Sequence, residues 1–255
     1  MKLSKMKHLA VCLAMLGTSL VAQAQSADSS KLGSTLTPVG AEKAGNAAGT
    51  IPAWNGGLSK PPAGFDPAKG YLDPFAADKP VLTITAANME QHKDKLAPGQ
   101  MEMMKRYPTY KLNVYPTQRT AAYRPDVYKF AKEEASGIKL AEGGNGILNL
   151  KKSNVPFPIP QDGIQVIWNH LMRDLGGSIT RYSADFPVQT NGSFTVGKRT
   201  ETISYASFMT DPEPNRIFYY LNQTTAPANA AGEVALVHEP LNQVQEPRLA
   251  WQYNP

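Results

Sequence analysis

Residues 177–223 read GSITRYSADFPVQTNGSFTVGKRTETISYASFMTDPEPNRIFYYLNQ, and this stretch decides the fold. Its apolar residues recur mostly at every second position, which indicates antiparallel β-strands. Asn191-Gly192 predicts a hairpin with a type I′ turn, because these residue types tolerate the positive φ that both central positions require. Together with the residues that follow, the pattern predicts a meander of strands near 178–188, 193–209, 215–223, 233–239 and 247–253.

The second of these strands changes its alternation part-way along. Phe194 and Val196 have even numbers, whereas Ile203 and Tyr205 have odd numbers. Because side chains alternate between the two faces of a strand, one residue has to be absorbed near Gly197 by a bulge or a turn. The change of parity therefore predicts a bend in the sheet.

The third strand is apolar on both faces. Phe218 and Tyr220 lie on one face, and Ile217, Tyr219 and Leu221 lie on the other. A strand of this kind needs cover on both sides. A helix can cover only one face, so the other must meet a second layer, an apolar ligand or further chain.

An amphipathic helix is predicted just before the sheet. Asp162 is a suitable N-cap, and Gly176 a suitable stop. We expect the apolar face of this helix to pack on the sheet, because its members recur at steps of three and four. They are Ile164, Ile167, Trp168, Leu171, Met172 and Leu175.

Shorter elements are expected upstream of this helix. Patterns of charge, Pro and apolar spacing predict helices near 85–96, 98–107 and 125–135, and a strand over 110–115. Residues 143–146, Gly-Gly-Asn-Gly, are expected to form a loop. As a phosphate cradle this loop is a weak candidate, because no third glycine follows at the spacing of the dinucleotide fingerprint.

Residues 25–80 are expected to form an extended arm. Between 33 and 80 the chain has 7 Pro and 8 Gly in 48 positions, which disfavours regular structure. A disordered linker is the alternative, but such linkers contain few aromatic residues. We therefore expect the aromatic side chains of the arm to pin it to a surface, and these are Trp54, Phe65, Tyr71 and Phe75.

The first 24 residues have the pattern of a secretory signal peptide. Three lysines precede an apolar run over 9–21 and the small residues Ala22 and Ala24. An uncleaved membrane anchor is the alternative, although the run is shorter than the roughly 20 residues that a span requires. Cleavage after Ala24 would remove Cys12, the single cysteine, and lower the formal net charge of +5 to +2.

Composition narrows the class of protein. Of 255 residues, 42% are hydrophobic and 18% charged, enough for one substantial core and unlike a coiled coil, a collagen-like fibre or a disordered acidic tail. Lys and Arg are scattered, so we expect no nucleic-acid partner. No later apolar run reaches 18 residues, so we expect no transmembrane span in the mature chain.

Residues able to carry chemistry are dispersed. No zinc-protease, nucleophile-elbow, phosphate-loop or calcium-loop motif is present. His92, His170 and His238 lack metal-ligand spacing, so we expect no metal and no other cofactor. His238-Glu239 is expected to be a surface pair, and Glu201 to be solvated. The chain is therefore predicted not to be an enzyme, with a hydrolase of unrecognised site as the minor alternative.

Several phrases together resemble a known family. They are LTPVGAEKAGN at 36–46, IPAWNGG at 51–57, VYPT at 114–117, and FPIP at 157–160 leading into IWNH at 167–170. They resemble a Gram-negative family of secreted proteins known as domain of unknown function 1329, which is distantly similar to the LolA and LolB lipoprotein carriers.

The resemblance implies an α+β fold with a strongly curved antiparallel sheet, half a barrel, against the amphipathic helix. It also implies the periplasm or the inner face of the outer membrane. Members of the family are usually longer, so we expect residues 81–255 to be the N-terminal part of a single LolA-like domain that is truncated at Pro255.

In LolA-like folds the concave face of the sheet holds acyl chains. The resemblance therefore implies a non-enzymatic carrier of lipid, lipoprotein or another hydrophobic molecule. The candidate groove residues are Tyr205, Phe218, Tyr220 and Trp251. The alternative is a scaffold or accessory partner of an envelope export system, which would use the arm and the open sheet edge.

Overall fold

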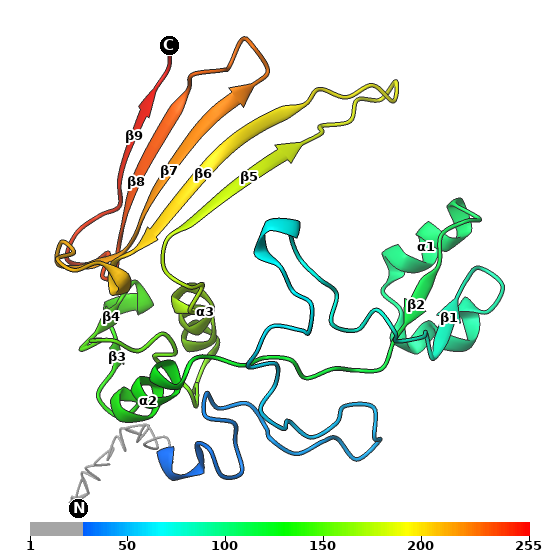
Figure 1. Ribbon diagram of the computed structural model, residues 1–255, viewed down its shortest axis with the longest axis horizontal. Coiled ribbons are helices and arrows are strands. Elements are labelled where there is room, and N and C mark those ends of the chain that lie inside the picture. The colour runs from blue at the N-terminus through cyan, green and yellow to red at the C-terminus, as the bar shows by residue number, and fades with distance from the viewer. Residues whose placement is uncertain (1–27) are drawn as a thin grey trace, which may run out of the picture.

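The computed structural model describes residues 28–255, and the predicted signal peptide lies outside the described residues. The fold is α+β with antiparallel sheets. Figure 1 shows the largest sheet at one end of the molecule, with α2 (Pro125–Glu134) and α3 (Gly163–Met172) near one end of its strands. The helix α1 (Pro98–Arg106) lies far from that sheet.

The large sheet is the predicted meander. Its strand order is the chain order, each strand is antiparallel to the next, and the two edges are formed by the first and last strands. All five expected strands are confirmed. They are β5 (Ile179–Asp185), β6 (Gly197–Tyr205), β7 (Arg216–Ala226), β8 (Val234–Pro240) and β9 (Leu249–Tyr253).

The hairpin between β5 and β6 turns at the predicted place, but with a different geometry. Gly192 has a φ of 82°, whereas Asn191 is not among the residues with positive φ. The Gly192 N–H donates to the backbone carbonyl of Gln189 at 2.9 Å, and the Gln189 N–H donates to the backbone carbonyl of Ser193 at 2.8 Å. The type I′ assignment was wrong: this is a three-residue loop that ends on a left-handed glycine.

Two register shifts interrupt β7. The shift opposite Lys198 and Arg199 confirms an irregularity near Gly197, although the extra residue is Thr225 of β7 and not a residue of β6. The second shift lies between Arg216 and Phe218, and it leaves Ile217 without a partner residue in β8. Ile217 and Phe218 consequently both contact the same buried cluster, although they are consecutive.

The register defines the two faces of the sheet. One face, called the Glu201 face, also has Arg181, Tyr220 and Val237. The opposite face, called the Trp251 face, has Leu221 and Leu236 beside Trp251. Both faces are therefore partly apolar near β7 and β8, as expected.

The helix α3 begins as predicted. The Asp162 carboxylate accepts a hydrogen bond from the Gln165 N–H at 2.9 Å, which satisfies one of the free donors of the first turn. The helix ends at Met172 and not near Leu175, because Arg173 has an extended conformation. The core between α3 and the sheet consists of Ile138, Ile147, Phe157, Trp168, Met172 and Ile217.

The upstream elements lie where the sequence predicts them, but one of them is a different type of helix. The α-helices α1 and α2 are confirmed, and the expected helix near 85–96 is a 3-10 helix, η3 (Met89–Lys95). Four short 3-10 turns also occur among the described residues: η1 (Ser29–Lys31), η2 (Pro67–Lys69), η4 (Glu142–Gly144) and η5 (Ala206–Phe208). The small sheets pair β1 (Leu82–Ile84) with β2 (Leu112–Val114), and β3 (Lys139–Leu140) with β4 (Ile147–Leu148).

The N-terminal arm, residues 28–80, is held mainly through its backbone. The Arg119 guanidinium donates hydrogen bonds to four arm carbonyls, the closest that of Glu42 at 2.6 Å. The Trp54 indole donates to the Ala121 oxygen at 2.9 Å. Tyr71, in contrast, is fully exposed, so the expectation that all four aromatic residues pin the arm was wrong for this residue.

Gly40 provides a test of how the arm is held. It has a φ of +92°, and a Cβ there would lie 1.5 Å from the Pro158 oxygen, whereas Gly49, at φ +68°, has open space around it. Both Ala variants carry the strain of a positive φ, about 1 kcal/mol. We expect Gly40→Ala to raise the rate of tryptic cleavage after Lys43 at least tenfold through local opening of the arm. Gly49→Ala should change it by less than about twofold, and equal rates in the two variants would contradict this account.

Candidate functional site

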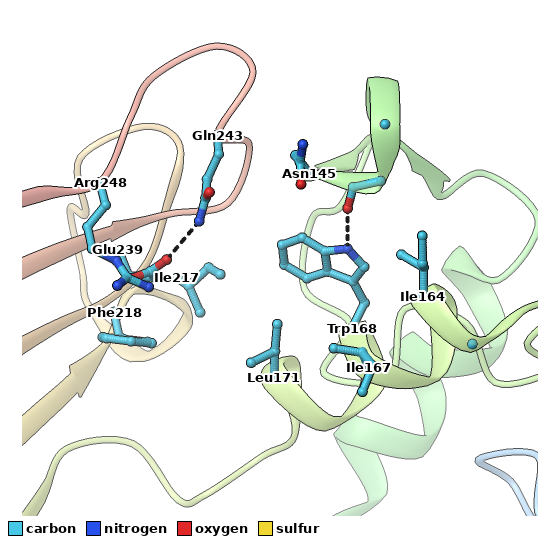
Figure 2. A pocket seen from close by; sticks show the side chains of 13 residues that line it. Asn145, Ile164, Ile167, Trp168, Leu171, Ile217, Phe218, Glu239, Gln243 and Arg248 are labelled. Carbon is cyan, nitrogen blue, oxygen red and sulfur yellow. Dashed lines mark hydrogen bonds and ion pairs between the residues drawn. The ribbon is translucent and has the colours of Figure 1, made fainter.

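A cleft of about 430 Å³ lies between α3 and one end of the Glu201 face. Its volume is within the range of about 300–1,000 Å³ typical of small-molecule sites. Figure 2 shows the side chains of α3 facing those of the sheet across it. This α3 cleft is lined by α3 itself, by Ile217 and Phe218 of β7, by the loop at Gly143–Asn145, and by Glu239, Gln243 and Arg248.

The helical wall is one stripe of α3. Ile164, Ile167, Trp168 and Leu171 have the spacing of a single helix face, and all four line the cleft. Trp168 is 6% exposed, but Ile167 is 57% exposed. The expectation that the sheet covers the apolar face was therefore wrong, because α3 contacts the buried cluster through Trp168 and Met172 while the rest of the stripe borders the cleft.

Two sets of hydrogen bonds fix the rotation of α3. The Trp168 indole donates to the Gly144 oxygen at 2.9 Å. The Asn169 side chain accepts from the Phe157 N–H at 2.9 Å and donates to the Phe157 oxygen at 2.7 Å. Since Asn169 follows Trp168 directly, these bonds hold the helix from two sides and keep the stripe directed at the cleft.

The glycine loop forms a wall of the cleft. Gly143 and Gly144 have φ values of 65° and 78°, and a Cβ on Gly144 would lie 3.0 Å from Ile164. A Cβ on Gly146 would lie 2.7 Å from the Asn242 Cα. The loop therefore needs glycine for its backbone conformation and its close approach to neighbours, reasons that its sequence alone could not distinguish.

The sheet wall depends on the bulge at Ile217. Because of the register shift, Ile217 and Phe218 both line the cleft. The Phe218 ring also packs edge-to-face on Tyr205, with 5.9 Å between the ring centroids. This contact supports the Phe218 ring from the side of β6.

One edge of the cleft is polar. The Glu239 carboxylate, whose side chain is 8% exposed, accepts from Arg248 Nε at 2.5 Å and from Gln243 Nε2 at 3.2 Å. The expected surface pair of His238 and Glu239 was wrong, because neighbours in a strand point to opposite faces. The His238 ring lies instead on the Trp251 face, 4.7 Å from Tyr219 and 5.1 Å from Trp251 between ring centroids.

The structure does not bring the four predicted groove residues together. Tyr205, Phe218 and Tyr220 share the Glu201 face, whereas Trp251 lies on the opposite face beside Leu236. Of the four, Phe218 lines the α3 cleft, and Tyr205 packs against Phe218. The residues that the sequence analysis missed as site residues are those of the exposed α3 stripe, and their periodicity was the available signal.

The middle of the Glu201 face is polar. The Glu201 carboxylate forms two hydrogen bonds of 2.8 Å with Arg181, and accepts from the hydroxyls of Ser183 and Tyr220 at 2.7 Å. The prediction that Glu201 is solvated was therefore wrong, since its side chain is 8% exposed. This cluster separates the apolar cleft from the far end of the sheet.

Hydrogen bonding from Arg181 lowers the pKa of Glu201 to about 2, against the opposing effect of burial. Burial, and then the hydrogen bond to Glu201, raise the pKa of Tyr220 to about 12. The carboxylate is therefore ionised and the phenol protonated at neutral pH, so both act as fixed hydrogen-bonding groups.

Residues 28–255 contain neither a helix able to span a membrane nor a cluster of metal-ligating side chains. No helix in this range combines the length and the apolar character that a membrane span requires. No three side chains of His, Cys, Asp or Glu in the same range come together as a metal site.

Comparison with known proteins identifies the family. The model of the family described as Protein of unknown function (DUF1329) matches residues 83–255. The chain belongs to this family. It is also 48% identical over 250 residues to the uncharacterized protein PA3922 of Pseudomonas aeruginosa. That match covers 96% of this chain and 54% of the relative, so the chain spans about half the relative's length. No solved structure matches.

The lowered pKa of Glu201 predicts how stability depends on pH. The folded state binds fewer protons than the unfolded state between the folded pKa of about 2 and the ordinary value of 4.5. The contribution of Glu201 is therefore complete above about pH 5 and is lost as the pH falls toward 2. We expect Glu201→Gln to lower the free energy of unfolding at pH 7 by about 2 kcal/mol, and to flatten its pH dependence in this window.

Urea unfolding at several pH values measures both effects. Glu90→Gln is the control, because Glu90 is an exposed residue of η3, far along the chain from the sheet. The control should leave the pH dependence of the wild-type protein unchanged. If the free energy of unfolding of Glu201→Gln depended on pH as steeply as that of the wild-type protein, the assignment of this pH dependence to Glu201 would be contradicted.

Proposed function

We propose that this protein is a non-enzymatic carrier of lipid, lipoprotein or another hydrophobic molecule, and that the α3 cleft holds an apolar part of the ligand. The observation that carries the proposal is the uncovered stripe of α3. Ile164, Ile167 and Leu171 are each about half exposed on a well-formed helix, and they face Ile217 and Phe218 across the cleft. Apolar side chains so grouped favour an apolar occupant.

Covering the exposed part of the α3 stripe supplies part of the free energy that binding requires. Full burial of an Ile or Leu side chain contributes about 1.5–3 kcal/mol. Covering three side chains that are already about half buried would contribute roughly 3 kcal/mol, before the sheet wall is counted. Micromolar affinity for an apolar ligand corresponds to about 8 kcal/mol of binding free energy in total.

Binding is proposed in preference to catalysis because Glu239, the acidic residue that lines the cleft, already accepts hydrogen bonds from its neighbours. Both oxygens of Glu239 accept hydrogen bonds, one from Arg248 and one from Gln243. A general base requires an oxygen that can reach a substrate proton. The Glu239 carboxylate instead serves as a fixed polar boundary of the cleft.

The location is also part of the proposal. The charged start, apolar run and small residues over 1–24 favour export by a cleavable signal peptide, with a site of action in the periplasm or on the inner face of the outer membrane. The relation to the LolA and LolB half-barrel rests on the motif resemblance and is supported by the antiparallel meander. The curvature of the sheet belongs to the same proposal.

Adjacent residues of α3 supply a matched test of the binding site. Ile167 and Val166 are 57% and 52% exposed, but only Ile167 lines the cleft. We expect Ile167→Asp to weaken the binding of the uncharged apolar dye Nile red at least tenfold, because a carboxylate in the cleft would have to be desolvated. Val166→Asp should change the affinity by less than about twofold.

Fluorescence titration of the purified protein measures both affinities, and circular dichroism verifies that both variants keep their helices. Lipid extraction followed by mass spectrometry asks in parallel whether a native ligand accompanies the protein. Equal loss of dye binding in the two variants, or no dye binding by the wild-type protein, would remove the support for this site.

A second candidate function rests on the arm. Tyr71 is fully exposed and Leu72 is 46% exposed, which suits an apolar contact with another protein. We propose as the alternative that the chain is an accessory partner of an envelope export system. In that case a protein partner should co-purify with the wild-type chain and be lost from Tyr71→Ala, while dye binding stays unchanged.

A further inference from the structure

We propose, on the basis of the carrier function proposed above, that the ligand of the α3 cleft is an acyl chain joined to an uncharged head group that both donates and accepts hydrogen bonds. Esters of glycerol and amides of acylated peptides have this chemistry. The juxtaposition that points to it is a strip of apolar side chains that ends at a polar edge whose charges cancel.

The polar edge lies at one side of the cleft. Glu239 is the cross-strand neighbour of Phe218 on the Glu201 face. Arg248, just before β9, and Gln243, in the loop after β8, both donate to its carboxylate. In Figure 2 these groups stand on the sheet side, opposite Leu171 and Ile167. A ligand chain between the two walls would place its head group at this edge.

The formal charges of the lining residues sum to zero. Glu239 is the acid and Arg248 the base among them, and they form one ion pair. The hydrogen bond from Arg248 to Glu239 raises the pKa of the guanidinium above its ordinary value, so Arg248 stays charged. A charged head group of either sign would attract one partner of the pair and be repelled by the other.

Hydrogen-bonding capacity nevertheless remains at this edge. Arg248 uses its Nε for Glu239, and within residues 28–255 its two terminal nitrogens have no acceptor. Gln243 donates through Nε2, and its Oε1 has no donor in the same part of the chain. The Asn145 amide also lines the cleft. Donors and acceptors are therefore both available, as a hydroxyl, ester or amide head group requires.

Three probes with one lauryl-type chain and different heads test the inference. They are monolaurin, which is uncharged, laurate, which is an anion, and laurylamine, which is a cation. All three are titrated below their micellar concentrations by displacement of Nile red. We expect the wild-type protein to bind monolaurin at least fivefold more tightly than either charged probe.

Charge variants then reverse the preference in a predicted direction. Glu239→Gln leaves the Arg248 cation and should improve laurate relative to monolaurin about tenfold. Arg248→Gln leaves the Glu239 anion and should improve laurylamine instead. The double variant has no charge at this edge and should recover the preference for monolaurin. It therefore still tests the inference if Arg248→Gln alone fails to fold.

Glu102→Gln is the control for net charge. It changes the charge of the whole protein as much as Glu239→Gln does, but it alters the exposed pair of Glu102 and Lys105 in α1. This control should leave the order of the three probes unchanged. A change equal to that of Glu239→Gln would overturn the proposal.

The remaining outcomes separate this inference from the proposed function. Equal binding of the three probes, or tighter binding of laurate or laurylamine by the wild-type protein, would overturn the uncharged head group and leave the carrier function standing. Failure to bind Nile red and all three probes would overturn both. An uncharged lauroyl dipeptide amide, tested beside monolaurin, distinguishes a lipoprotein-type ligand from a free lipid within the uncharged class.

Discussion

The contact between Ile217 and the last turns of α3 is the interaction on which the rest of the structure depends. A regular β7 would direct Ile217 away from Phe218 and toward the opposite face. The register shift instead brings both side chains to the buried cluster that contains Trp168 and Met172. Without the bulge, Ile217 would leave this cluster and the sheet would lose its buried contact with α3.

The apolar stripe of α3 is not arranged for maximal stability. A helix with this pattern would bury more surface if the sheet lay directly against it. Bonds at Trp168 and Asn169 hold it at an angle where half of the stripe remains uncovered. Natural proteins depart from the most stable arrangement chiefly where they function, which is why the proposal of a binding site rests on the uncovered stripe.

Local patterns in the sequence predicted much of the fold. The alternation after Gly177, the N-cap at Asp162 and the prolines at 98 and 125 each act within a few residues, and each element was confirmed near its expected place. Errors arose where distant residues decide. The strand that holds the extra residue at Thr225 and the partner of Glu201 both depend on cross-strand register, which a single strand does not encode.

The candidate site was predicted only in part for the same reason. Phe218 was selected from the alternation of its strand, and it does line the cleft. To place Trp251, the alternation would have to be followed from β7 through two loops to β9, and Trp251 in fact lies on the other face. The glycines at 143 and 144 were expected to form a loop, but the close approach of Gly144 to Ile164 of α3 is visible only in three dimensions. Periodicity indicated the stripe of α3, whereas its exposure depended on packing.

The hydrogen bonds that Arg119 donates to the arm have a consequence for synthesis. The carbonyls of Glu42 and Pro52 are held by a side chain 77 and 67 positions later in the chain. A polypeptide that emerges from its N-terminus must therefore wait with its arm unattached until that arginine has followed. The many prolines and glycines of the arm suit this interval, because such a chain resists premature β-pairing with other nascent chains.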